Sequence, residues 1–114
     1  MKIRIKEQFI RFRLTKTDVR KLAEDGMVIE HSQFLTRMLI YSIVRTTGHQ
    51  LSIDFDGKAI IVGMPGQMID ELSTTEIVGF SENSSLMKIL VEKDFICLEA
   101  PLEDQSDNYD HPNS

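Results

Sequence analysis

The sequence predicts an α+β fold, in which an antiparallel, barrel-like sheet of eight strands is accompanied by two short helices. Eight short segments have the apolar spacing of strands, and two others carry apolar residues at helical spacing. These segments follow the order ββαββ twice, in residues 1–46 and again in 51–92. Because a closed barrel leaves no sheet edge unpaired, we expect the eight strands to close on themselves.

The N-terminal strands are predicted by alternation of basic and apolar side chains in residues 2–6 and again in 9–14. The apolar positions change phase between the two segments. A two-residue turn at Glu7-Gln8 that joins them into a hairpin explains this change most simply. A bulge within one long strand is the alternative.

The rest of the first half is predicted to be a helix and two strands. The stretch from Thr15 to Asp18 resembles a capping box, so we expect a short helix that begins there and ends near Gly26. Strands over 27–34 and 37–46 follow. The second of these is apolar on both faces, which indicates a central, buried strand.

The second half contains the strongest turn signal of the chain, the pair Asp56-Gly57. It predicts a hairpin with a two-residue loop, in which Ile53 would pair with Ile60. The remaining elements are a helix that begins near Pro65 and strands over 76–81 and 85–92.

Charge is distributed unevenly along the 114 residues, whose formal net charge is −5. Residues 1–21 contain eight basic and two acidic side chains, whereas residues 99–114 contain five acidic and no basic ones. We therefore expect one α+β domain over 1–98 and an acidic C-terminal tail over 99–114. We expect the tail to mask the basic segment, with Tyr109 and Pro112 as apolar anchors. Three acidic residues would then reach the cations: Asp104, Asp107 and Asp110.

The five basic side chains of the N-terminal hairpin would share one sheet face: Lys2, Arg4, Lys6, Arg11 and Arg13. Like charges directly opposite each other destabilise a hairpin by roughly 0.2–1 kcal/mol per pair. Solvation, interleaved carboxylates or a bound anion would offset that repulsion. Since arginine presents planar, bidentate donors to phosphate and carboxylate, we expect a small-anion site here, and a solvated outer face or a protein interface is the alternative.

The sequence contains only weak signals for catalysis, a reactive thiol or metal binding. Glu92 and Asp94 would project to the same side of the last strand, so they are the only candidate catalytic pair, although a charged strand end is a commoner arrangement. Cys97 lies among apolar residues and is expected to be a structural thiol. The three histidines lack metal-ligand spacing, so we expect neither a metal site nor a cofactor.

Several blocks together resemble a family of small bacterial proteins known as a domain of unknown function, over essentially the whole chain. The blocks are KIRIK at residues 2–6, IRFRLT at 10–15, ILVEKDF at 89–95, Cys97-Leu98, and the ending Asp107-Asn108-Tyr109 with Pro112-Asn113. This resemblance implies no reaction.

At the level of the fold, the repeated ββαββ plan resembles the CYTH superfamily. That resemblance implies an eight-stranded antiparallel barrel around a tunnel that binds triphosphate and a divalent metal. The superfamily signature is Glu-x-Glu-x-Lys in the first strand, and only Lys6 matches it here, since Lys2 and Arg4 replace both carboxylates. Cations at these positions should repel a metal, so the resemblance favours the barrel and disfavours triphosphate hydrolysis.

We therefore expect a cytoplasmic anion-binding module rather than an enzyme, with a phosphate-rich small molecule or an acidic protein as its partner. A divergent phosphate-processing enzyme and a purely structural interaction domain are the alternatives. The sequence isoelectric point of about 5.1 argues against nucleic acid, and the apolar runs are too short for a membrane helix of about 20 residues.

Overall fold

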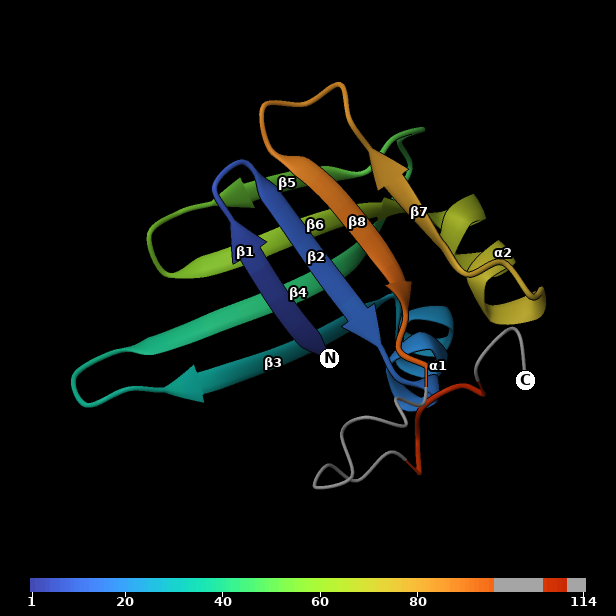
Figure 1. Ribbon diagram of the computed structural model, residues 1–114, viewed down its shortest axis with the longest axis horizontal. Helices are drawn as coiled ribbons and strands as arrows, with labels where there is room; N and C mark the ends of the chain where they lie inside the picture. Colours follow the sequence, from blue (N-terminus) through green and yellow to red (C-terminus); the bar gives the residue numbers. More distant parts are fainter. Residues whose placement is uncertain (96–105, 111–114) are drawn as a thin grey trace.

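Two mixed four-stranded sheets pack against each other in the computed structural model, which describes residues 1–95 and 106–110 (Figure 1). Sheet A has the strand order β1-β2-β8-β7, and sheet B has the order β3-β4-β6-β5. The elements are β1 (Lys2–Lys6), β2 (Phe9–Leu14), α1 (Lys16–Asp25), β3 (Met27–Gln33), β4 (Met38–Thr46), β5 (Ser52–Phe55), β6 (Ala59–Pro65), α2 (Gly66–Thr74), β7 (Gly79–Glu82) and β8 (Lys88–Lys93).

The order ββαββ does occur twice, as predicted, and the two halves exchange hairpins. Sheet A combines β1 and β2 of the first half with β7 and β8 of the second, and sheet B combines β5 and β6 with β3 and β4. The exchanged hairpins meet in two central parallel pairs, β2 with β8 and β4 with β6. Each sheet is therefore held together by strands from both halves of the chain.

The prediction of a closed antiparallel barrel is wrong for the described residues. Each sheet is open, with β1 and β7 at the edges of one and β3 and β5 at the edges of the other, and each has a parallel pair at its centre. The alternation of side chains predicts which face of a strand is buried, but it does not specify the partner strand or its direction. Without a barrel, the resemblance to the CYTH superfamily has no support in the fold.

The N-terminal hairpin has the register that the sequence predicted, with Lys2 opposite Arg13 and Arg4 opposite Arg11. Its two-residue turn requires a left-handed backbone at Glu7, which has φ of 50°. An L-residue adopts this conformation at a cost, since its Cβ approaches the following carbonyl. The turn therefore forms without the glycine or asparagine that such turns favour.

The second hairpin differs from its predicted register. Phe55 pairs with Ile60, and Ile53 pairs with Val62 instead of Ile60, so the connecting loop is longer than the predicted two residues. The carboxylate of Asp56 accepts hydrogen bonds from the backbone N–H groups of Lys58 and Ala59 at 2.8 Å, which stabilises the longer turn. The shift is by two residues, so the same side chains still face the core.

The core lies between the two sheets and beneath the helices, and it includes buried residues from both halves. Sheet A contributes Ile10, Phe12, Leu14, Ile89 and Val91; sheet B contributes Val28, Ile43, Ile60, Val62 and Met64; the helices contribute Val19, Leu22, Ile69 and Leu72. β4 occupies a central place in sheet B, as predicted, but only its middle residues are fully buried.

The helices lie together at one end of the sheets and contact each other (Figure 1). α1 begins with the predicted capping box, in which Thr15 and Asp18 exchange side-chain to backbone hydrogen bonds, and it ends at Gly26 in the left-handed conformation. α2 starts after Pro65, as predicted. Neither described helix has the length and apolar character required to cross a membrane.

Candidate functional site

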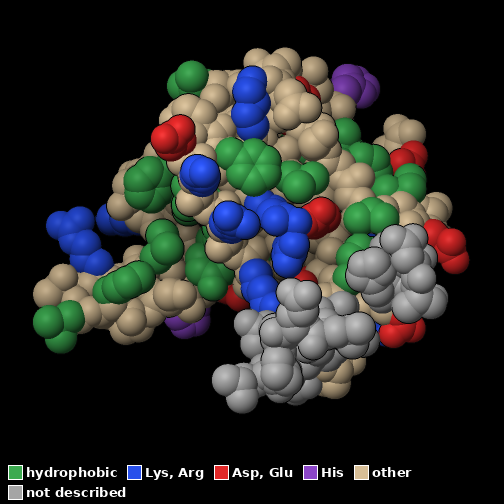
Figure 2. Space-filling model, in the orientation of Figure 1, with side chains coloured by type: hydrophobic (Ala, Val, Ile, Leu, Met, Phe, Trp, Pro, Cys, Tyr) green, Lys and Arg blue, Asp and Glu red, His purple; other side chains and the backbone are tan. Residues whose placement is uncertain are grey.

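The outer face of sheet A carries the basic residues that the sequence singled out. Figure 2 shows Lys and Arg side chains gathered over β1 and β2 in the middle of this face, with hydrophobic side chains around them. We call this group the cationic face and define it by five residues: Lys2, Arg4, Lys6, Arg11 and Arg13. Period-2 alternation places all five on the side of the sheet that points away from the core.

The parallel pairing of β2 with β8 extends the cationic face across the sheet. In successive rows, Glu92 lies beside Arg13, Leu90 beside Arg11, and Lys88 beside Phe9. Lys88 thus adds a sixth basic residue at one corner, where its Nζ donates to carbonyl groups of the β7–β8 turn. Lys88 was not predictable as part of this face, because no local signal in the sequence shows that β2 and β8 are neighbours.

Glu92 is the acidic residue in these rows, and it contacts two arginines. Its Oε1 accepts hydrogen bonds from Nε of Arg11 at 2.6 Å and from Nε of Arg13 at 3.2 Å. The terminal guanidinium nitrogens make no hydrogen bond with the described residues. Glu92 therefore holds both side chains in place and leaves their outer donors available to a ligand.

The cationic face is hollowed between β1 and β2. A cavity of about 240 Å³ is lined by Lys2, Ile3, Arg4, Arg11 and Arg13, so four of the five predicted anion-binding residues share one concavity. Lys6 lies outside its lining. Arg4 and Lys6 form no ion pair with the described residues, in contrast to Lys2, Arg11 and Arg13.

The two candidate catalytic carboxylates serve as counterions of the cationic face. Glu92 is occupied by Arg11 and Arg13, as described above. Asp94, which is 2% exposed, places Oδ2 3.2 Å from Nζ of Lys2. Within the described ranges, no cluster of three or more His, Cys, Asp or Glu side chains could hold a metal ion. Both carboxylates are thus engaged by basic side chains of the cationic face.

Residues 106–110 of the acidic tail dock beside α1 instead of over the cationic face. The carbonyl of Asp107 accepts from the N–H of Lys16 at 3.1 Å, and its Oδ2 accepts from the N–H of Thr17 at 3.4 Å. The pKa of Asp107 is lowered, above all by the side chain of Thr17, with smaller effects from the side chain of Thr15 and the backbone N–H of Thr17. Since the start of a helix carries unpaired N–H groups and a partial positive charge, a carboxylate is stabilised there.

Tyr109 anchors the tail, as the sequence predicted. Its N–H donates to the carbonyl of Asp94 at 2.8 Å, and its ring centroid lies 5.9 Å from that of Phe95. Neither Asp107 nor Asp110 forms an ion pair with the cationic face in the described structure. The predictions for Cys97, for Asp104 and for the rest of 96–105 and 111–114 lie outside the described residues.

Residues 1–113 match a family of unknown function (DUF7009). No curated protein and no solved structure matches the chain.

Proposed function

Because the chain belongs to this family of unknown function, DUF7009, whose description carries no activity, we propose a function from the site alone: the cationic face binds small, phosphate-rich anions. One observation carries the proposal. Four basic side chains from two adjacent strands line a single cavity of about 240 Å³, and the acidic residue beside them occupies only Nε of two guanidinium groups.

The arrangement favours a polyanion with several oxygens. Arginine side chains present paired N–H donors in a plane, which suits phosphate oxygens, and a lysine at the border adds a point charge. Cross-strand neighbours stand about 4.5–5.5 Å apart at Cβ, so a chain of phosphates can contact Arg4 and Arg11 together. Binding would also relieve the repulsion between the opposed cations, which the free protein has to offset with Glu92 and water.

We favour binding over hydrolysis because the nearby carboxylates already contact basic side chains. A metal-dependent phosphoryl transfer needs carboxylate oxygens for Mg²⁺, and the nearest ones, in Glu92 and Asp94, already contact basic side chains. The ligand is therefore expected to bind without a divalent metal.

Calorimetric titration with tripolyphosphate, with and without Mg²⁺, tests the proposal. We expect binding in metal-free buffer that weakens from low salt to about 0.15 M, where screening acts over about 8 Å. Arg4→Gln should weaken binding roughly 2- to 5-fold, the effect of losing one partly exposed charge contact worth up to about 1 kcal/mol. Lys21→Gln, at an exposed position of α1, changes the net charge equally and is the matched control.

Arg11→Lys separates recognition by the guanidinium plane from recognition by charge. The variant keeps the charge but loses the paired donors, so we expect weaker binding if the planar group is used. Absence of binding in both buffers, or binding only with Mg²⁺, would contradict the proposal. An equal loss of tripolyphosphate affinity in Arg4→Gln and Lys21→Gln would show that binding depends only on the net charge of the protein.

A further inference from the structure

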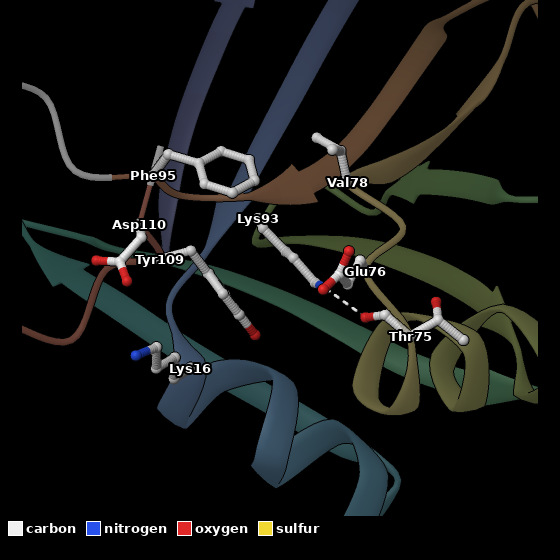
Figure 3. A pocket seen from close by; sticks show the side chains of 8 residues that line it. All are labelled: Lys16, Thr75, Glu76, Val78, Lys93, Phe95, Tyr109 and Asp110. Carbon is white, nitrogen blue, oxygen red and sulfur yellow. Dashed lines mark hydrogen bonds between the residues drawn. The ribbon is translucent and has the colours of Figure 1, made fainter. Parts of the chain in front are cut away.

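A second cavity lies at the helical end of the molecule, away from the cavity of the cationic face. It has a volume of about 420 Å³ and lies among the start of α1, the chain that leaves α2, the end of β8 and the docked tail (Figure 3). This volume is within the range of about 300–1,000 Å³ that is typical of small-molecule sites. None of the residues that line it belongs to the cationic face.

A buried lysine points into this cavity. Lys93 is 6% exposed, and its Nζ donates to the carbonyl of Thr75 at 2.9 Å and lies 5.0 Å from the centroid of the Tyr109 ring. An ammonium group has three donors, and Thr75 accepts from one of them. Burial lowers the pKa of Lys93, although the charge of nearby Glu76 acts in the opposite direction. Lys93 therefore retains donors that a ligand in the cavity could use.

The other charged residues of the cavity balance one another. Glu76 lies beside Lys93, and Asp110 lies at the other side, nearer to Lys16, with the ring of Tyr109 between the two lysines (Figure 3). The lining thus has two basic and two acidic side chains. A simple anion would be repelled by Glu76, and a simple cation would be repelled by Lys93.

The remaining walls are apolar. Phe95 and Val78 line the cavity together with the ring of Tyr109, whose pKa is raised chiefly by burial. An aromatic and aliphatic surface next to paired opposite charges suits a molecule with an apolar body and a dipolar end.

We propose that this cavity binds a small zwitterion, an α-amino acid with an apolar side chain. Its carboxylate accepts from Lys93, its ammonium group contacts Glu76, and its side chain packs against Phe95 and Tyr109. The bound carboxylate accepts from a donor of Lys93 that Thr75 does not use. The docked tail forms part of the site, since Tyr109 and Asp110 belong to it.

A ligand series tests the charge requirement on the full-length protein. The backbone ¹⁵N–¹H NMR spectrum is followed during titration with phenylalanine, with 3-phenylpropionate, which lacks the ammonium group, and with 2-phenylethylamine, which lacks the carboxylate. We expect phenylalanine to shift the amide signals of Glu76, Lys93 and Tyr109, and each truncated compound to bind at least about 10-fold more weakly. Equal affinity for phenylalanine and 3-phenylpropionate, or no shift with any of the three compounds, would overturn the proposal.

Two variants test the assigned contacts. Glu76→Gln changes an exposed residue, should keep the fold, and should weaken phenylalanine binding several-fold without affecting 3-phenylpropionate. Glu71→Gln, on α2, has the same charge change and is the matched control. Lys93→Met should abolish binding, with circular dichroism as the check that it folds. Unchanged phenylalanine affinity in Glu76→Gln would contradict the proposal, whatever the tripolyphosphate titration shows, because the two cavities share no residue.

Discussion

The guanidinium group of Arg11 and the carboxylate of Glu92 are 81 residues apart in sequence and 2.6 Å apart in space, between Nε and Oε1. The contact joins the first hairpin of the chain to its last strand across the parallel pair of β2 and β8. Since Glu92 also accepts from Arg13, one carboxylate offsets the repulsion between two cations that face other cations in β1. The positive charge that the cationic face presents is therefore reduced by Glu92, an acidic residue of β8 that lies outside the hairpin.

Glu92→Gln is expected to strengthen anion binding. The substitution removes the counterion of Arg11 and Arg13, so at low salt tripolyphosphate should bind roughly 2- to 5-fold more tightly, which corresponds to less than about 1 kcal/mol. Thermal unfolding should occur at a lower temperature, because the cations then repel one another without relief. Glu24→Gln, an exposed change on α1, is the control, and a weaker affinity in Glu92→Gln would show that Glu92 orients the arginines more than it neutralises them.

The protein is expected not to hydrolyse phosphate compounds. Both candidate carboxylates are engaged by basic side chains, and the described residues contain no cluster of metal ligands. Phosphate release from tripolyphosphate and from p-nitrophenyl phosphate, with Mg²⁺ or Mn²⁺, should equal that of a buffer blank. A rate that disappears in Glu92→Gln would instead support the phosphate-processing alternative.

Glu7→Gly is expected to stabilise the protein by about 1 kcal/mol, because Glu7 has a left-handed backbone that costs an L-residue roughly 1–2 kcal/mol. Gly57 has φ of 91° and open space around it, so Gly57→Ala isolates the same backbone effect and should destabilise the protein. Urea unfolding of both variants measures the two changes. If both variants changed the free energy of unfolding by the same amount and in the same direction, the backbone conformation of the turns would not control stability here.

The docking of the tail is expected to weaken in acid. The pKa of Asp107 is lowered in the folded protein, above all by the side chain of Thr17, so its contribution to stability is present above the ordinary value of 3.8. That contribution is lost as the pH falls through the lowered value. Asp107→Asn should therefore be less stable than the wild type at neutral pH, and the difference should vanish in strong acid.

Thermal unfolding at a series of pH values, with Asp25→Asn as the control on α1, measures this difference. The difference in unfolding temperature between the wild type and Asp107→Asn could instead stay constant with pH. The backbone contacts of residues 107–109 would then hold the tail, without a contribution from the carboxylate.

The candidate site was partly predictable from local patterns. The alternation in residues 2–14 specifies which side chains share a face, and a short turn then sets the register, so Lys2 opposite Arg13 and Arg4 opposite Arg11 followed from the sequence. The capping box of α1 was predictable for the same reason, since its partners lie three residues apart.

Contacts between distant segments were decided only by the tertiary structure. Side-chain period has no information about which strand lies next to which, or in what direction, so the parallel pair of β2 and β8 could not be inferred and a barrel was expected instead. The pairing of Glu92 with Arg11, the place of Lys88 and the cavity around Lys93 all depend on that exchange of hairpins. The sequence by itself determined the local elements and the basic face, because these depend on neighbours a few residues apart. The packing of the two halves determined which charged residues of other strands lie next to the basic face.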